Sequence, residues 1–117
     1  MTQEIRDTDY RVWFEAEANR AALRFEGSIR LRPHDYEPLW SFLVAALDGK
    51  PETLTLDFRT LTFLNSSGIN AVYKLAVEMR KRGGLKLLVL SNDNAWQKKS
   101  LPNLKRFLPG TEIQIAT

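Results

Sequence analysis

Two adjacent serines, Ser66 and Ser67, are the residues whose type and position most directly suggest chemistry. They follow Asn65 and precede Gly68 within LTFLNSSGINAVYKL, the stretch from residue 61 to residue 75. Asparagine and serine are favourable N-cap residues, because their side-chain oxygens accept hydrogen bonds from the unpaired N–H groups of a first helical turn. The stretch therefore predicts a helix start at Asn65, and capping alone is a sufficient local explanation of the serines.

Catalysis by one of these serines would require a general base and a group that orients it. The only histidine is His34, in an Arg-Pro-His-Asp context typical of a surface loop. The serine turn matches neither a GxSxG motif nor a GxxxxGK[ST] phosphate loop, and no carboxylate pair, metal-ligand cluster or cysteine stands out. We therefore expect a protein that is not an enzyme, with no catalytic residue, cofactor or metal site.

Phosphorylation is the chemistry that fits a serine at a helix start. The free N–H groups and the partial positive charge of a helix N-terminus stabilise a phosphate, which adds a charge of about −1.5 to −2. A partner docked over the turn would meet this buried dianion and lose affinity. Phosphorylation there would thus switch binding without unfolding the domain.

Hydrophobic periodicity places the serine turn between a strand with its trailing loop and a helix. Alternating apolar residues predict strands at 12–18, 21–31, 53–58 and 113–115, and an almost continuous apolar run predicts another at 85–90. Helical spacing predicts helices at 36–47, 69–82 and 94–108, the last broken by Pro102. The order ββαβαβαβ predicts an α/β fold in which helices pack on a mixed sheet, in a single domain spanning 1–117.

Several details of these elements follow from local rules. Asp35 is expected to cap the first helix and Gly49 to end it, and Asn19-Arg20 is expected to form a tight hairpin. The strand at 85–90 is expected to be central in the sheet and covered on both faces, because it lacks polar alternation. The residues of the last helical segment expected to point inward are Trp96, Leu101, Leu104 and Leu108.

Composition is that of an ordinary soluble protein. The chain has 117 residues, 44% hydrophobic and 26% charged, with a net charge of +3 and no cysteine, which fits the reducing cytoplasm. Its first residues are charged and no run approaches the roughly 18 apolar residues of a membrane span, so we expect a cytoplasmic protein without direct membrane insertion. The late cations, Arg80, Lys81, Arg82, Lys98, Lys99, Lys105 and Arg106, are interpreted as solvated helix faces rather than a nucleic-acid site.

The stretch LTLDFRTLTFLNSSGINAVYKLAVEMRKRGGLKLLVL resembles the core of the STAS domain, specifically that of the bacterial anti-sigma factor antagonists. In that family a strand leads through a short loop into Asp-Ser-Ser/Thr-Gly and a helix, followed by a strand of the LKLLVL kind. FEGSIRLRPHDYEPL, residues 25–39, resembles the family's strand-glycine-loop segment before its first helix. The resemblance covers the chain from about residue 12 to residue 115.

The resemblance implies a non-enzymatic partner switch with a role in signal transduction and transcription regulation. In the family, the unphosphorylated antagonist binds an anti-sigma factor, itself a serine kinase of the histidine-kinase-like ATPase type. Phosphorylation of the first serine abolishes binding, and a metal-dependent serine phosphatase restores it. Ser66 aligns with that serine and Ser67 with a supporting hydroxyl, while Gly68 leaves room for close approach of another backbone. The implied partner-binding residues are Asn65, Ser66, Ser67, Gly68 and Asn70.

Two features depart from the family pattern. Asn65 stands where the family usually has aspartate, which keeps the cap but replaces a carboxylate with a neutral amide. The segment SNDNAWQKKSLPNLKRFLPG is more basic and more broken than the family's last helix, which suggests a different partner.

Two alternatives stay open. The chain could be a constitutive STAS scaffold that is not phosphorylated, such as the small cytoplasmic subunit of a lipid-transport ABC system. Nucleic-acid binding through the late basic cluster is a weaker alternative, and it predicts strong salt dependence.

Overall fold

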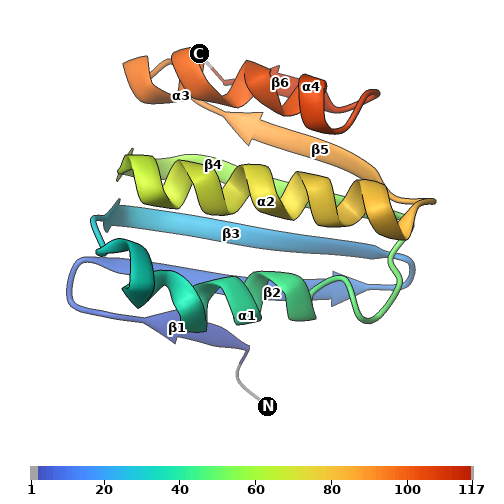
Figure 1. The fold of residues 1–117 in the computed structure, drawn as a ribbon, viewed down its shortest axis with the longest axis horizontal. Helices are drawn as coiled ribbons and strands as arrows, with labels where there is room; N and C mark the ends of the chain where they lie inside the picture. Colours follow the sequence, from blue (N-terminus) through green and yellow to red (C-terminus); the bar gives the residue numbers. More distant parts are fainter. Residues whose placement is uncertain (1–2, 117) are drawn as a thin grey trace.

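Within residues 3–116, which this computed structural model describes, six strands form one mixed sheet. The strands are β1 (Glu4–Arg6), β2 (Tyr10–Glu17), β3 (Arg20–Ile29), β4 (Thr53–Leu64), β5 (Lys86–Ser91) and β6 (Glu112–Ile115). They lie in the sheet in the same order as in the chain (Figure 1). The predicted α/β fold with a mixed sheet is confirmed, and β1 is an additional strand that the predicted order lacks.

The sheet changes from antiparallel to parallel at β3. β1, β2 and β3 pair antiparallel, and β3 to β6 pair parallel. A short turn suffices for antiparallel neighbours, whereas parallel neighbours need a longer crossover, here helical. The β2–β3 turn is Ala18-Asn19 rather than the predicted Asn19-Arg20, and Ala18 has a φ of 54°.

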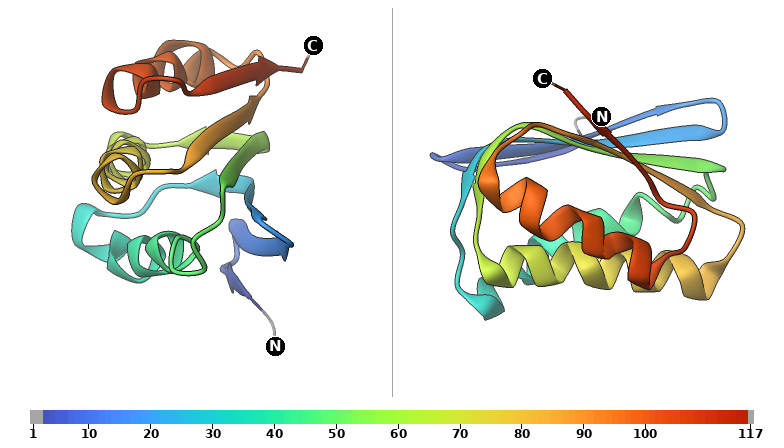
Figure 2. Two further views of the ribbon diagram at one scale, coloured as in Figure 1. Left: turned by 90° about the vertical axis from the view of Figure 1, so that its right-hand side faces the viewer. Right: turned by 90° about the horizontal axis from the view of Figure 1, so that it is seen from above.

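The helical segments cover one face of the sheet (Figure 2). The first crossover contains the 3-10 turn η1 (Pro33–Tyr36) and α1 (Glu37–Ala45), and the second contains α2 (Ser66–Arg82). The third contains α3 (Ala95–Ser100), the 3-10 turn η2 (Leu101–Asn103) and α4 (Leu104–Phe107), so the predicted break at Pro102 is confirmed. Right-handed crossovers that all step in the same direction place their helices on the same side.

The expectation that the strand at 85–90 is central and covered on both faces is wrong. β5 lies next to the edge strand β6. Leu87 and Val89 are buried under the helices, whereas Leu88 and Leu90 point to the open face and are only half-buried. The apolar run therefore reflects one buried face and one partly covered face.

The core lies between the sheet and the helices. Fully buried side chains come from the inner face of the central strands and from the helices, among them Leu23, Leu56, Phe58, Leu75 and Met79. The rings of Phe25 and Phe58 stack with centroids 4.6 Å apart. Leu101 and Leu104 are buried as predicted, whereas Trp96 and Leu108 are half-buried and pack against the core.

The predicted cap of the first helix is wrong. Asp35 accepts a hydrogen bond from Nε of Arg32 at 3.0 Å instead of capping, and Tyr36 occupies the N-cap position of α1 without a side-chain cap. The helix ends at Ala45, and a turn carries the chain through Gly49. Among the described residues, no helix is both long enough and apolar enough to cross a membrane.

Candidate functional site

Strand β4 delivers the chain directly to the serine turn. It runs to Leu64, six residues beyond the predicted end at Phe58, so Asn65 follows the strand without the expected loop. The register between β3 and β4 shifts twice, between Arg24 and Glu26 and between Gly27 and Ser28. Such irregularities in pairing, of which β-bulges are one kind, interrupt the alternation of apolar residues, so the sequence pattern indicated too early an end of the strand.

Asn65 is the N-cap of α2, as predicted, and its side chain joins three segments. Its Oδ1 accepts from the N–H of Gly68 at 3.0 Å and from the hydroxyl of Tyr36. Its Nδ2 donates to the carbonyl of Leu31 at 2.8 Å. The start of α2 is therefore fixed to both the end of β3 and η1.

These bonds give a physical reason for an amide at position 65. An aspartate could accept from Gly68 and Tyr36, but it could not donate to the Leu31 carbonyl. Burial raises the pKa of Tyr36, so its hydroxyl stays protonated and donates to Asn65. The departure from the family's aspartate is thus built into the local hydrogen bonding of this chain.

Gly68 is buried and required by packing. A Cβ at this position would lie 2.2 Å from Cδ1 of Leu64 and 2.6 Å from the Tyr36 hydroxyl oxygen. The family resemblance implies close approach of another backbone here, but in this structure the side chains of Leu64 and Tyr36 fill the space. Gly68 consequently lies buried beneath the surface of the serine turn.

The structure separates the two serines. Ser66 is the first residue of the 17-residue helix α2 and is exposed, whereas Ser67 is half-buried. Ser66 faces a hollow of about 480 Å³ between the start of α2 and α3, whose lining includes Phe63, Ile69, Asn70, Trp96 and Lys99. Ser67 faces a second hollow of about 190 Å³ towards α1, whose lining includes Tyr36, Trp40, Asn70 and Lys74. The exposed Asn70 borders both hollows.

Each hollow combines aromatic side chains with one lysine. Lys99 lines the Ser66 hollow, and Lys74 lines the Ser67 hollow with its Nζ 4.7 Å from the Trp40 ring centroid. Negative charge added to Ser66 would therefore lie at a helix N-terminus and in a hollow that also contains a cation. No local sequence pattern places Lys74 or Lys99 at these hollows, because each hollow is lined by segments that are far apart in the chain.

Gln97 is a site-forming residue that the sequence analysis missed. It is fully buried, and its Nε2 donates to the carbonyls of Phe58 and Leu61 at 2.8 and 3.0 Å. Its Oε1 accepts from the N–H of Asn92 at 2.8 Å. Gln97 thus attaches α3 to β4 and positions the helix that carries Trp96 and Lys99. The sequence does contain a signal for this role, because Gln97 falls at helical spacing on the same face as the inward-pointing Leu101 and Leu104.

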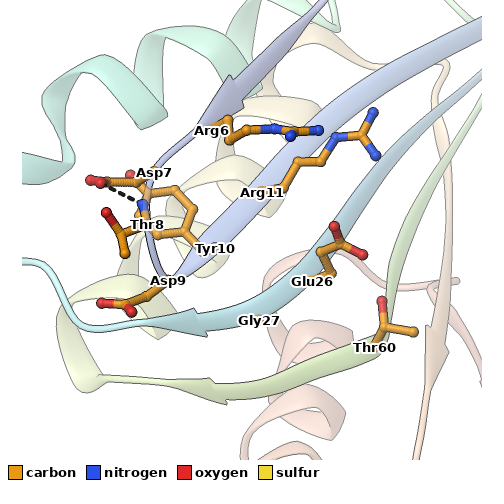
Figure 3. A pocket seen from close by; sticks show the side chains of 9 residues that line it. All are labelled: Arg6, Asp7, Thr8, Asp9, Tyr10, Arg11, Glu26, Gly27 and Thr60. Atoms are coloured by element: carbon orange, nitrogen blue, oxygen red, sulfur yellow. Dashed lines mark hydrogen bonds between the residues drawn. The ribbon is translucent and has the colours of Figure 1, made fainter.

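A further hollow of about 410 Å³ lies beside the β1–β2 turn (Figure 3). Neither Ser66 nor Ser67 is among the residues that line it. Arg6 and Arg11 extend along one side of it, but both guanidinium groups pair with Glu4, at 3.7 and 2.5 Å. Gly27 is required there, because a Cβ would lie 2.2 Å from the Asp9 carbonyl oxygen. This hollow is explained by the close approach of the hairpin turn to β3.

His34 lies exposed in η1 with Nε2 3.5 Å from the Asp35 carboxylate, and it lines neither serine hollow. Within residues 3–116, no group of three or more His, Cys, Asp or Glu side chains is arranged to hold a metal ion. The geometry around Ser66 is that of an exposed hydroxyl beside a surface hollow.

No protein-family model and no curated protein matches the chain. Solved structures do match it along nearly its whole length. An anti-sigma factor antagonist from Mycobacterium paratuberculosis is 18% identical with a TM-score of 0.67, covering 92% of this chain and 90% of that one. The anti-sigma factor antagonist SpoIIAA in its unphosphorylated form is 18% identical with a TM-score of 0.60, covering 91% and 88%.

SiaC of Pseudomonas aeruginosa is 17% identical, with a TM-score of 0.63 and coverage of 97% of both chains. A second structure describes SiaC as the activator of the diguanylate cyclase SiaD, with which it forms a complex. The chain therefore has the STAS fold of the anti-sigma factor antagonists, in agreement with its sequence resemblance.

Proposed function

We propose that this protein is a non-enzymatic cytoplasmic regulator that binds a partner protein through the start of α2 and releases it when Ser66 is phosphorylated. The observation that carries the proposal is the exposed Ser66 hydroxyl, placed at the first residue of a 17-residue helix and beside an aromatic hollow. The fold is one in which anti-sigma factor antagonists occur, and one of these was solved in a form described as unphosphorylated.

A phosphate on Ser66 would be accommodated without unfolding. The first-turn N–H groups of α2 lack intrahelical partners, and the helix dipole favours negative charge at this end. Lys99 lines the same hollow and adds a cation. The cap itself uses Asn65, so the phosphate does not have to replace an existing contact of Ser66.

The proposed binding surface consists of the exposed side chains of Ser66 and Asn70 and the half-buried Asn65 and Ser67. Gly68 supports this surface from below through its packing against Leu64 and Tyr36. The proposed partner is an anti-sigma factor that is also a serine kinase of the histidine-kinase-like ATPase type. A metal-dependent serine phosphatase would restore the binding form.

The similarity to SiaC favours a second kind of partner. SiaC is described as the activator of a diguanylate cyclase, and its match covers 97% of this chain. In this version the partner is a signalling enzyme whose activity depends on the bound regulator. The start of α2 and the Ser66 switch have the same role in both versions.

The test is phosphorylation with the kinase from the native host. The chain is incubated with that kinase and ATP, and intact-mass analysis is expected to show the gain of one phosphate. Ser66→Ala should abolish the gain and Ser67→Ala should retain it. Unchanged phosphorylation of Ser66→Ala refutes the site, and co-purification with a membrane ATPase in place of a kinase supports the constitutive scaffold instead.

A further inference from the structure

We propose that the surface formed by α3 and α4 beside Ser66 binds an acidic, amphipathic segment of the partner protein, and that phosphorylated Ser66 competes with this segment. We call the exposed cations of this surface the basic rim, which consists of Lys98, Lys99, Lys105 and Arg106. This inference rests on the proposed function, because it specifies the partner chemistry at the same site.

The basic rim has an unbalanced charge. Residues 94–111 include these four cations and no aspartate or glutamate. Within residues 3–116, none of the four forms an ion pair, whereas the open face of the sheet neutralises its cations locally. Arg24 and Arg59, for example, both hydrogen-bond to Asp57, at 2.6 and 2.9 Å. A partner that contacts the rim gains most by supplying carboxylates.

The rim is held in a fixed position beside α2. The Tyr73 hydroxyl donates to the Ser100 carbonyl at 2.8 Å and accepts from Nδ2 of Asn103 at 3.2 Å. The Tyr73 and Phe107 rings lie 5.0 Å apart. Figure 1 shows α3 and α4 running alongside α2. The rim thus has a fixed place next to α2, and its Lys99 lines the same hollow as Ser66.

The hollow between them selects for a protein segment over a nucleic acid. Its lining includes Phe63, Ile69 and Trp96, so its occupant needs apolar side chains as well as carboxylates. The rings of Trp96 and the buried Phe58 pack at 81° to each other with centroids 5.9 Å apart, so part of the Trp96 ring is used for core packing. Single-stranded nucleic acids bind by stacking on exposed aromatic rings, whereas Trp96 and Phe63 are both half-buried and Phe63 is also covered by Arg30.

The position of Lys99 connects the basic rim to the switch. Lys99 lines the hollow that also contains Ser66. A phosphate on Ser66 places a dianion where the partner's carboxylates would bind, so it both repels the partner and pairs with Lys99. The phosphate on Ser66 would thus take the place of the partner's carboxylates.

The experiment uses the full chain labelled with ¹⁵N and two synthetic peptides. The first peptide has about 14 residues, roughly four helical turns, with leucines on one face and glutamates on the other. The second replaces each glutamate with glutamine, and a single-stranded oligonucleotide of similar length is titrated separately. We expect the glutamate peptide to shift amide resonances of residues 65–70 and 95–106.

Charge reversal supplies the matched variants. Lys98→Glu/Lys99→Glu should lower the affinity for the glutamate peptide about tenfold, because two attractive charge pairs across the interface become repulsive. Lys50→Glu/Lys86→Glu changes the charge equally near the other end of α2, where Lys50 lines a hollow with Arg82 and Gly83, and should leave the affinity within about twofold. Phosphorylation of Ser66 should also lower the affinity for this peptide about tenfold.

Three outcomes overturn the proposal: no shift with the glutamate peptide at low salt, equal binding of the glutamine peptide, or tighter binding of the oligonucleotide. Intact-mass analysis of the same variants keeps the proposed function separate. Retained Ser66 phosphorylation with no peptide binding defeats the acidic-partner inference alone. If the peptide binds but Ser66 is never phosphorylated, the proposed phosphorylation switch is refuted, whereas the proposed binding surface for an acidic segment is retained.

Discussion

The hydroxyl of Tyr36 donates a hydrogen bond to Oδ1 of Asn65, the same atom that caps α2 by accepting from Gly68. This contact joins residues 29 positions apart in the chain. It couples the loop after β3 to the first turn of the helix that carries Ser66. The geometry of the candidate phosphorylation site therefore depends on a residue outside the motif itself.

Replacement of Asn65 and Tyr36 should show this coupling. Asn65→Ala should lower the free energy of unfolding by about 1–3 kcal/mol, because it removes the cap and leaves the Leu31 carbonyl without its donor. Tyr36→Phe should cost about 1 kcal/mol. Urea unfolding of both single variants and the double variant should give a coupling of about 0.5–1.5 kcal/mol, whereas strict additivity would contradict the shared bond.

Asn65→Asp tests the reason given for the amide. The carboxylate keeps the acceptor for Gly68 but brings an oxygen against the Leu31 carbonyl, so we expect a loss of about 1–3 kcal/mol by urea unfolding at neutral pH. Asn70→Asp, at an exposed position in the second turn of α2, serves as the control and should change stability by about 0.5 kcal/mol or less. Equal stability of Asn65→Asp and the unchanged chain would refute the explanation.

Gly68→Ala should destabilise the protein through overpacking. The added methyl group would overlap Leu64 and Tyr36, and such overpacking typically costs about 1–3 kcal/mol. Gly49→Ala is the matched control, because a Cβ there has no heavy atom within 4 Å. Thermal unfolding of the two variants should therefore differ clearly, and a Gly68→Ala variant as stable as Gly49→Ala would contradict the packing.

The features that sequence predicted correctly depend on local rules. The N-cap at Asn65 follows from side-chain chemistry, and the break at Pro102 follows from a missing N–H and a fixed φ. The α/β fold follows from the order of strands and helices. These rules need only neighbouring residues, so they can be read from the chain directly.

The features that sequence missed depend on distant contacts. β4 continues past Phe58 because it stays paired with β3 as far as Leu64, with shifts in register where the apolar alternation fails. β1 has only three residues, too few to show a period. Ser66 and Lys99 line the same hollow only because of where α3 lies. Hydrogen bonds from Gln97 to β4 fix that position. No local pattern contains that information.

Gln97→Leu should destabilise the protein and loosen α3. The change leaves the buried carbonyls of Phe58 and Leu61 without their donor, and each buried unsatisfied group costs about 1–3 kcal/mol. Hydrogen exchange should show lost protection in α3 and at the end of β4. Gln114→Leu, at an exposed position on the edge strand, should leave α3 protected. Undiminished protection of α3 in Gln97→Leu would count against the assigned role.

Asp57 should make stability depend on acid pH. Burial alone would raise the pKa of this carboxyl, but hydrogen bonds from Arg59 and Arg24 outweigh burial and hold the pKa below its ordinary value of 3.8. A depressed native pKa stabilises the fold above the ordinary value, and this contribution is lost as the pH falls below it. The difference in urea stability between the unchanged chain and Asp57→Asn should therefore be larger at pH 7 than near pH 3. A constant difference over this range would show that the carboxylate charge does not contribute.

Ser66→Glu should separate an effect on binding from an effect on folding. A carboxylate at the first residue of α2 interacts favourably with the helix N-terminus, so stability should stay equal or rise by about 0.3–1 kcal/mol. Binding to the partner should nevertheless weaken, because the new charge faces the same hollow as the partner. Circular dichroism during thermal unfolding measures the first quantity, and titration with the purified partner measures the second. Ser67→Glu, at the half-buried neighbour that faces α1, is the matched control and should affect that binding less. A Ser66→Glu variant that unfolds would mean that charge at this position acts on the fold itself, which contradicts a switch based on binding.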